Sequence, residues 1–281
     1  MKLAAIDLDG TLLNSKSEIS KENAEAIKRA GDKGIEVIIA TGRAHFDVIE
    51  IFRDSSLKPW VIGANGATIH DPQGNLFHSV PIGREKAEGI LEWLEQQEFY
   101  YEVFSEKAIY TPQSGRELLE IEMDRLVSAN PEVSLKDLQL AASKQYSQSG
   151  FAFVDSFKSI PEHAEIYNIL AFSFNEKKRL NGWNQFKDTE GLTIVTSAHH
   201  NFELEHESAS KGIALGKLAE KLGIPLKETA AIGDSMNDES MLLVAGKSFA
   251  VGNARNEIKK ISQTICGTND ENGVAQMLNS L

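Results

Sequence analysis

Short apolar runs alternate with longer segments of helical pattern, and this rhythm limits the possible folds more than any other feature of the chain. Ser20 can cap a helix that extends through Ala30, and residues 44–53 also have a helical pattern. We expect Gly31 and Gly34 to end the first of these helices. A βαβαβ order predicts parallel strands joined by right-handed crossovers. The expected strands of this region are Leu3–Leu8, Ile35–Ala40 and Trp60–Ala64.

The last part of the chain repeats the same rhythm. We expect a helix over residues 211–222, ended by Gly223, and a shorter helix over residues 237–244. The apolar runs Thr229–Ile232 and Phe249–Val251 indicate buried strands, and Ile265 lies near a final one. The two regions together predict an α/β fold with a Rossmann-like, doubly wound parallel sheet.

The middle of the chain is more polar and less regular. Two helices are expected here, over residues 85–97 and 115–127. We therefore predict an α/β domain inserted between two parts of one core domain: core over residues 1–82, insertion over residues 83–205, and core again over residues 206–281. The expected strands of the insertion are Phe99–Val103, Ala108–Tyr110, Ile169–Phe174 and Leu192–Val195.

Charge and cysteine content narrow the class of protein. The 281 residues carry a formal net charge of −12, and we expect neither nucleic acid nor membrane as a partner because both need positive surface. The single cysteine, Cys266, excludes an intrachain disulfide and suits a reducing compartment. Asp7 and Asp9 interrupt the first apolar run too early for a signal peptide. We expect a cytoplasmic protein.

Acidic residues follow the first apolar run directly, in the segment Asp7-Leu8-Asp9-Gly10-Thr11. Side chains alternate along an extended backbone, so Asp7 and Asp9 are expected to project the same way. Open α/β sheets bind ligands at the carboxyl ends of their strands. An Asp-Gly pair is equally typical of an ordinary turn, so this segment alone does not identify a site.

Two further polar segments follow the second and third apolar runs. In Thr41-Gly42-Arg43, a hydroxyl and backbone N–H groups at an expected helix start suit a phosphate, although a plain helix cap by Thr41 explains the same residues. Asn65-Gly66-Ala67 follows the third run. Because Asn-Gly is a strong hairpin signal, Thr68–Phe77 is a candidate hairpin.

The last part of the chain offers a lysine and more carboxylates. In Ser210-Lys211-Gly212, the lysine opens a helix, which is unfavourable against the helix dipole. This position points to an anionic partner for Lys211, with a solvated surface lysine as the alternative. In Gly233–Asp238, Asp234 and Asp238 add hard oxygen ligands without His or Cys, which indicates Mg²⁺ rather than zinc.

These segments occur together in one chain, each after an apolar strand, and in this order they resemble the haloacid dehalogenase superfamily. The similarity is to its Cof-like branch, which has a large α/β cap inserted after the third strand, and it covers the whole chain. The segments that carry it are Asp-x-Asp-Gly-Thr at 7–11, Thr-Gly-Arg at 41–43, Lys-Gly at 211–212 and Gly-Asp-Ser-x-Asn-Asp at 233–238.

The resemblance implies a Mg²⁺-dependent phosphatase with an aspartyl-phosphate intermediate. Asp7 would be the nucleophile and Asp9 the general acid and base. The implied metal ligands are Asp7, the backbone carbonyl of Asp9, and Asp234, with Asp238 in support. The implied phosphate-binding groups are Lys211, Thr41, Asn237 and the amides of Leu8 and Gly42, and candidate substrate contacts are Arg43 and Asn65.

The resemblance leaves the substrate open among small phosphorylated metabolites. Sugar phosphates, flavin mononucleotide, a phosphorylated riboflavin precursor and pyridoxal phosphate are the candidates. A phosphomutase of the same superfamily is an alternative, and a non-catalytic sensor of a phosphorylated ligand is a second one. The sequence assigns no oligomeric state.

Overall fold

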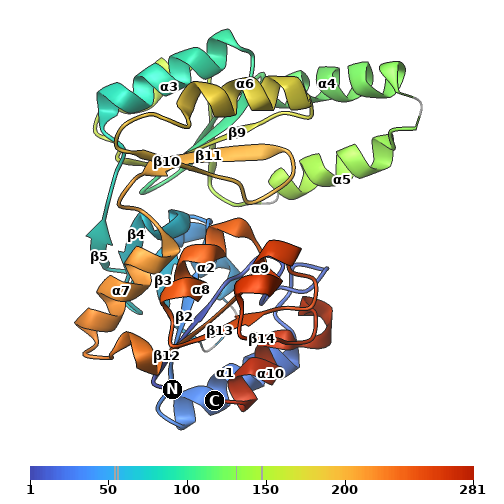
Figure 1. The fold of residues 1–281 in the computed structure, drawn as a ribbon. Coiled ribbons are helices and arrows are strands. Elements are labelled where there is room, and N and C mark those ends of the chain that lie inside the picture. Colours follow the sequence, from blue (N-terminus) through green and yellow to red (C-terminus); the bar gives the residue numbers. More distant parts are fainter. Residues whose placement is uncertain (54, 56, 131, 147) are drawn as a thin grey trace. The chain divides into compact units, whose positions relative to one another are not determined.

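The computed structural model describes residues 1–281 except residues 54, 56, 131 and 147. The described residues form two compact units, each with its own sheet (Figure 1). The second unit takes most of its residues from the middle of the chain. The first unit comprises Met1–His45, Ile51–Ser79 and Ser208–Leu281, and the second comprises Phe46–Glu50 and Val80–Glu207.

In the described part of the chain, the first unit is built on an eight-stranded sheet with the order β14-β13-β12-β1-β2-β3-β4-β5. Strands β14 to β3 pair in parallel, and β4 and β5 are antiparallel additions at one edge. Both β1 and β12 are buried along their whole length, as aliphatic strands of a covered parallel sheet should be. The strands are β1 (Leu3–Ile6), β2 (Glu36–Ala40), β3 (Trp60–Gly63), β4 (Thr68–His70), β5 (Leu76–Ser79), β12 (Thr229–Gly233), β13 (Lys247–Ala250) and β14 (Thr264–Ile265).

The helices of the first unit pack in pairs on this sheet, α1 against α10 and α7 against α8. Ser20 caps α1, because its hydroxyl accepts a hydrogen bond from the Asn23 N–H. The expectation that Gly31 ends this helix is wrong. A glycine lowers helix propensity without removing a hydrogen bond, and α1 continues past it to Asp32. The helices are α1 (Lys21–Asp32), α7 (Lys211–Lys221), α8 (Glu239–Val244), α9 (Asn256–Ile261) and α10 (Gly273–Asn279).

The second unit contains a six-stranded mixed sheet, in the order β10-β11-β9-β6-β7-β8 over its described residues. Neighbouring strands are antiparallel except β7 and β8. The strands are β6 (Tyr100–Ser105), β7 (Ile109–Pro112), β8 (Phe151–Val154), β9 (Ile166–Phe172), β10 (Leu192–Val195) and β11 (Asn201–His206). The helices are α3 (Arg84–Gln96), α4 (Gly115–Ala129), α5 (Leu135–Gln145) and α6 (Glu176–Phe186), and α2 (His45–Ile51) contributes residues 46–50. A parallel core sheet with a second, mixed sheet confirms the predicted α/β fold class.

One face of the second sheet packs on α3 and α6 to form an apolar core (Figure 1). Tyr101 and Val103 of β6 point into this core with Leu94 of α3 and Phe186 of α6. Period-two alternation then places Glu102 on the opposite face. Of the described helices, none is long and apolar enough to span a membrane.

Candidate functional site

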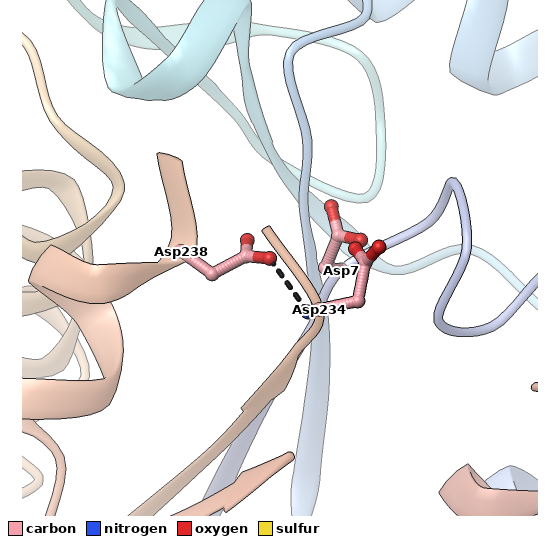
Figure 2. Close-up of side chains that lie close together, drawn as sticks. All are labelled: Asp7, Asp234 and Asp238. Atoms are coloured by element: carbon pink, nitrogen blue, oxygen red, sulfur yellow. Dashed lines mark hydrogen bonds between the residues drawn. The ribbon is translucent and has the colours of Figure 1, made fainter. Parts of the chain in front are cut away.

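Two adjacent parallel strands, β1 and β12, end at the candidate site. They pair in register, with Ile6 opposite Ile232, so Asp7 and Asp234 follow the two strands at the same edge of the sheet. Asp238 lies just beyond, in the short turn before α8, and Figure 2 shows the three side chains together. One carboxylate oxygen from each residue lies within 4.8 Å of the other two. The strand predicted over residues 3–8 ends at Ile6, and Asp7 follows it directly, with its N–H still donating to the Ile232 carbonyl of β12 at 3.1 Å.

Lys211 is the cation of this cluster. Its ammonium nitrogen lies 2.7 Å from Oδ1 of Asp7 and 2.7 Å from Oδ1 of Asp238, and its side chain is 0% exposed. Ser210 caps α7 and so fixes the point at which the lysine enters the site. Burial opposes the charge of Lys211, but Asp238 and Asp7 outweigh it and raise the pKa of the lysine. The burial of Lys211 contradicts the alternative of a solvated surface lysine, and the structure pairs it with the carboxylates of Asp7 and Asp238.

Asp238 organises the loop after β12. Its Oδ2 accepts hydrogen bonds from the backbone N–H groups of Asp234, at 2.9 Å (Figure 2), and Ser235, at 3.0 Å. Its Oδ1 accepts a hydrogen bond from the Lys211 ammonium group. Ser235 and Asp238 form a capping box. Both oxygens of this carboxylate thus contact protein donors, which fixes the loop that carries Asp234.

Burial and mutual repulsion destabilise the ionised carboxylates of the cluster. Burial raises the pKa of Asp7 to about 7, and the charge of Asp238 adds to the rise, against the opposing effect of Lys211. Burial likewise raises the pKa of Asp234 to about 9, with Asp7 and Asp238 adding to it. Three carboxylates share one lysine within the cluster, which leaves two negative charges uncompensated when all are ionised. Buried oxygen donors with excess negative charge fit a hard divalent cation such as Mg²⁺.

Asp9 has different surroundings from Asp7. Its side chain is 55% exposed, against 7% for Asp7. Both of its carboxylate oxygens accept hydrogen bonds from Arg43, Oδ2 from Nε at 2.6 Å and Oδ1 from Nη2 at 2.8 Å. The structure therefore joins the first and second polar segments of the sequence by an ion pair.

Thr41 stabilises the turn after β2 through its side chain and its backbone. The Thr41 hydroxyl accepts from the Arg43 N–H at 3.1 Å, and the Thr41 carbonyl accepts from the Asn65 N–H at 3.0 Å. Thr41 thus closes a turn before α2 and does not cap that helix, which begins at His45. The Asn65 amide oxygen in turn accepts from Asn237 at 3.0 Å.

Asn65 and Gly66 lie in the connection between antiparallel strands β3 and β4, and β4 forms a hairpin with β5, as expected. Gly66 has a φ of +103°, and a Cβ there would lie 2.2 Å from the carbonyl oxygen of Ser210. This glycine therefore allows the turn after β3 to pack against the start of α7. The Asn-Gly pair serves both the hairpin connection and the site.

Three further residues form hydrogen bonds in the candidate site, of which Thr11 belongs to the predicted segment 7–11, whereas Asn253 and Arg255 were not predicted as site residues. The Asn253 amide donates to the Gly10 carbonyl at 2.7 Å, the Arg255 N–H donates to the Asp234 carbonyl at 2.9 Å, and the Thr11 hydroxyl donates to Asp234 at 3.4 Å. Asn253 follows the strand β13. Asn253 thus lies, like the other candidate site residues, after a strand of this sheet.

The second unit has its own buried polar cluster, which was not predicted. Asn168, Glu203 and Glu205 are 0%, 3% and 2% exposed. They lie on neighbouring strands, with Asn168 opposite Glu205, and Asn168 donates to Glu203 at 2.9 Å. The sequence Asn-Phe-Glu-Leu-Glu-His at 201–206 has the strict alternation of a strand with one polar face. That alternation is the signal that could have identified β11.

Comparison with known proteins decides the family. The model of the haloacid dehalogenase-like hydrolases matches residues 4–278, nearly the whole chain. The chain belongs to this family. The resemblance expected from the four sequence segments is thereby confirmed.

Close relatives of this hydrolase are found in Bacillus subtilis (strain 168). Phosphatase YwpJ is 56% identical over 284 residues, with 100% of each chain covered. The 5-amino-6-(5-phospho-D-ribitylamino)uracil phosphatase YwtE is 42% identical over 282 residues, with 100% of this chain and 98% of the relative covered. A solved haloacid dehalogenase-like hydrolase from B. subtilis has the same fold, with a TM-score of 0.88, 56% identity and 100% of both chains covered. These matches confirm the expected enzyme class, a phosphatase.

Proposed function

We propose that this phosphatase hydrolyses a small phosphate monoester with the help of Mg²⁺, through an aspartyl-phosphate on Asp7. One observation supports this proposal most. Asp7 is a buried carboxylate at the end of β1, 2.7 Å from Lys211 and grouped with Asp234 and Asp238. A phosphate monoester is an anion that repels a carboxylate nucleophile, so the site needs positive charge close to the nucleophile. Lys211 supplies one such charge, and the excess of carboxylates would attract a divalent cation that supplies more.

Asp7, Asp234 and the backbone carbonyl of Asp9 would hold the Mg²⁺ ion. Asp238 would support them by fixing Lys211 and the loop of Asp234, since both of its oxygens contact protein donors. When bound, Mg²⁺ would offset the negative charge of the carboxylates and of the phosphate oxygens.

The chain's own groups would position the phosphate. An ammonium group has three donors, so Lys211 can bind a phosphate oxygen while it keeps its contacts with Asp7 and Asp238. The Thr41 hydroxyl, the Asn237 amide and the N–H groups of Leu8 and Gly42 would bind the other oxygens. Asn65 would act through Asn237, to which it is hydrogen-bonded.

Asp7 would attack phosphorus in line, and the bond from phosphorus to the leaving oxygen would break. Asp9 would give a proton to that oxygen. In the second half of the reaction, Asp9 would take a proton from a water molecule, which attacks the aspartyl-phosphate. Inorganic phosphate would leave, and Asp7 would return to its carboxylate form.

The substrate belongs to the small phosphorylated metabolites. The relative YwtE is named for a phosphorylated ribitylaminouracil, which favours the riboflavin-precursor phosphate among the candidates. Flavin mononucleotide, sugar phosphates and pyridoxal phosphate complete the panel to be tested. A general acid and base in the position of Asp9 can assist transfer of the phosphoryl group either to water or to another hydroxyl of the substrate. A phosphomutase is therefore the alternative outcome.

A panel of these monophosphates tests the proposal. Each compound is incubated with the purified chain in Mg²⁺ and in EDTA, and both free phosphate and isomerised products are measured. We expect phosphate release that requires Mg²⁺ and no isomerised sugar phosphate. An isomerised product without free phosphate would show that the protein is a mutase and not a phosphatase. No reaction with any compound would contradict both functions.

A further inference from the structure

Arg43 binds Asp9 through two parallel hydrogen bonds. Nε donates to Oδ2 at 2.6 Å and Nη2 donates to Oδ1 at 2.8 Å. This is the bidentate geometry in which a guanidinium fixes the plane of a carboxylate as well as its position. A single hydrogen bond would leave the carboxylate free to rotate.

The surroundings hold this arginine in place. The Arg43 N–H donates to the Thr41 hydroxyl at 3.1 Å, and the Arg43 carbonyl accepts from the Ala64 N–H at 2.9 Å. Only 11% of the Arg43 side chain is exposed. The arginine is therefore the fixed partner of the pair, and Asp9, 55% exposed, is the partner whose orientation depends on it.

The backbone that follows Asp9 is also held in place, at Gly10. Gly10 has a φ of +80°, and its carbonyl accepts from the Asn253 amide at 2.7 Å. These contacts fix the backbone next to Asp9 but not its side chain. Arg43 supplies the constraint that the backbone does not.

We propose that Arg43 is a positioning residue that acts through Asp9, holding its carboxyl group in the orientation from which it exchanges protons with the leaving oxygen and with water. This inference rests on the proposed function, in which Asp9 is the general acid and base. It differs from the expectation that Arg43 contacts the substrate, because Nε and Nη2 of Arg43 both donate to Asp9.

The two roles predict different kinetics. A substrate contact contributes to binding whether or not Asp9 is present, so its loss should raise KM by the same factor in either background. A residue that acts through Asp9 loses its effect once Asp9 cannot transfer protons, because effects of coupled residues are not additive. The decrease in kcat on removal of Arg43 should also depend on the leaving group. p-Nitrophenolate departs without accepting a proton, whereas an alkoxide needs one.

The experiment measures kcat and KM for four variants, Arg43→Ala, Arg43→Lys, Asp9→Asn and the double variant Arg43→Ala/Asp9→Asn. Two substrates are used, p-nitrophenyl phosphate and an alkyl monophosphate accepted by the wild type. Arg29→Ala is the control, because Arg29 lies on α1 with half of its side chain exposed. Inhibition by inorganic phosphate reports whether the phosphate site is intact.

We expect Arg43→Ala to lower kcat on the alkyl phosphate by about 10- to 100-fold, part of the range for acid–base catalysis. The loss on p-nitrophenyl phosphate should be smaller, and KM and phosphate inhibition should change by less than about threefold. In the Asp9→Asn background, Arg43→Ala should cost no more than about twofold. Arg43→Lys should stay close to Arg43→Ala, because lysine restores the charge but not the fork.

Full rescue by Arg43→Lys would overturn the positioning role, because charge alone would then suffice. A rise in KM of the same size with and without Asp9 would overturn it in favour of a substrate contact. If the wild type releases no phosphate from either substrate, the proposed function fails first and this inference falls with it.

Discussion

Lys211 and Asp238 form an ion pair at 2.7 Å with both side chains completely buried. The same lysine contacts Asp7. One cation therefore stabilises two buried carboxylates, and the cost of burying each charge depends on the other two. Removing the lysine leaves both carboxylates without this cation in the interior, which is far more costly than losing a surface pair.

Lys211→Met should therefore destabilise the protein by about 3–5 kcal/mol in the absence of divalent metal. The methionine keeps much of the volume, so the loss reports the charge. Urea unfolding in EDTA measures it. Lys217→Met is the matched control on an exposed position of the same helix. A Lys211→Met variant as stable as this control would contradict the account of the ion pairs.

Gly10 gives a second test, because its backbone and its contacts both exclude a side chain. Its φ is +80°, and a Cβ would lie 2.7 Å from the Asp234 carboxylate. Gly10→Ala should displace Asp234, lower stability by roughly 1–3 kcal/mol and weaken Mg²⁺ binding. Gly31→Ala is the opposite control, since Gly31 is the last residue but one of α1 and nothing lies within 4 Å of a Cβ there. It should stabilise the helix by about 0.5–1 kcal/mol, and equal effects of the two substitutions would refute the packing argument.

Asp234 links the metal to thermal stability. Mg²⁺ at about 100 times its Kd should stabilise the wild type by about 2.7 kcal/mol, visible as a higher Tm. Asp234→Asn should abolish this increase, because it removes one of the proposed carboxylate ligands. Without metal, the same variant should be at least as stable as the wild type, since burial disfavours the Asp234 carboxylate. Asp32→Asn, at the exposed end of α1, should keep the full response to Mg²⁺.

Glu102 gives the second unit a pH dependence of its own. Burial raises its pKa from 4.5 to about 7, against the opposing hydrogen bonds from Tyr100 and Gln145. The folded state thus binds the proton more tightly than the unfolded chain. The stabilising effect is complete below pH 4.5 and is lost as the pH rises through 7. Glu102→Gln should consequently be more stable than the wild type at pH 8, by up to about 3 kcal/mol, and little different at pH 5.

Urea unfolding of the two proteins from pH 5 to pH 8 tests this prediction. The difference between them isolates Glu102, because Asp7 and Asp234 titrate in both. Glu92→Gln, on an exposed position of α3, should follow the wild type at every pH. If the unfolding free energies of Glu102→Gln and wild type differ by the same amount at every pH, the pKa of Glu102 is the same in the folded and unfolded states, which would contradict this account.

The core of the site was predictable from the sequence because it follows from topology. Parallel strands share a carboxyl edge, so polar residues after successive apolar runs had to meet there. Asp7, Thr41, Asn65 and Asp234 each follow such a strand. The position of Lys211 at a helix start pointed to an anionic partner by the same kind of reasoning.

Other features depend on contacts that no local pattern contains. The pairing of Asp9 with Arg43 joins two strand ends by side-chain geometry alone. The strand β11 was not predicted although its residues alternate, because its buried polar residues, Glu203 and Glu205, give the segment the composition of an exposed loop. The continuation of α1 past Gly31 shows a weak local preference overridden by the rest of the helix.

The turnover of Asp7→Asn tests the central claim most directly. Asparagine has the shape of aspartate and can still accept a hydrogen bond from Lys211, so the folded site should persist with an unchanged unfolding midpoint. Phosphate release is measured at saturating Mg²⁺ with the best substrate of the panel. We predict that kcat falls by at least about 10⁴-fold, as expected when a nucleophile is removed. Steady turnover within tenfold of the wild type would contradict Asp7 as the nucleophile.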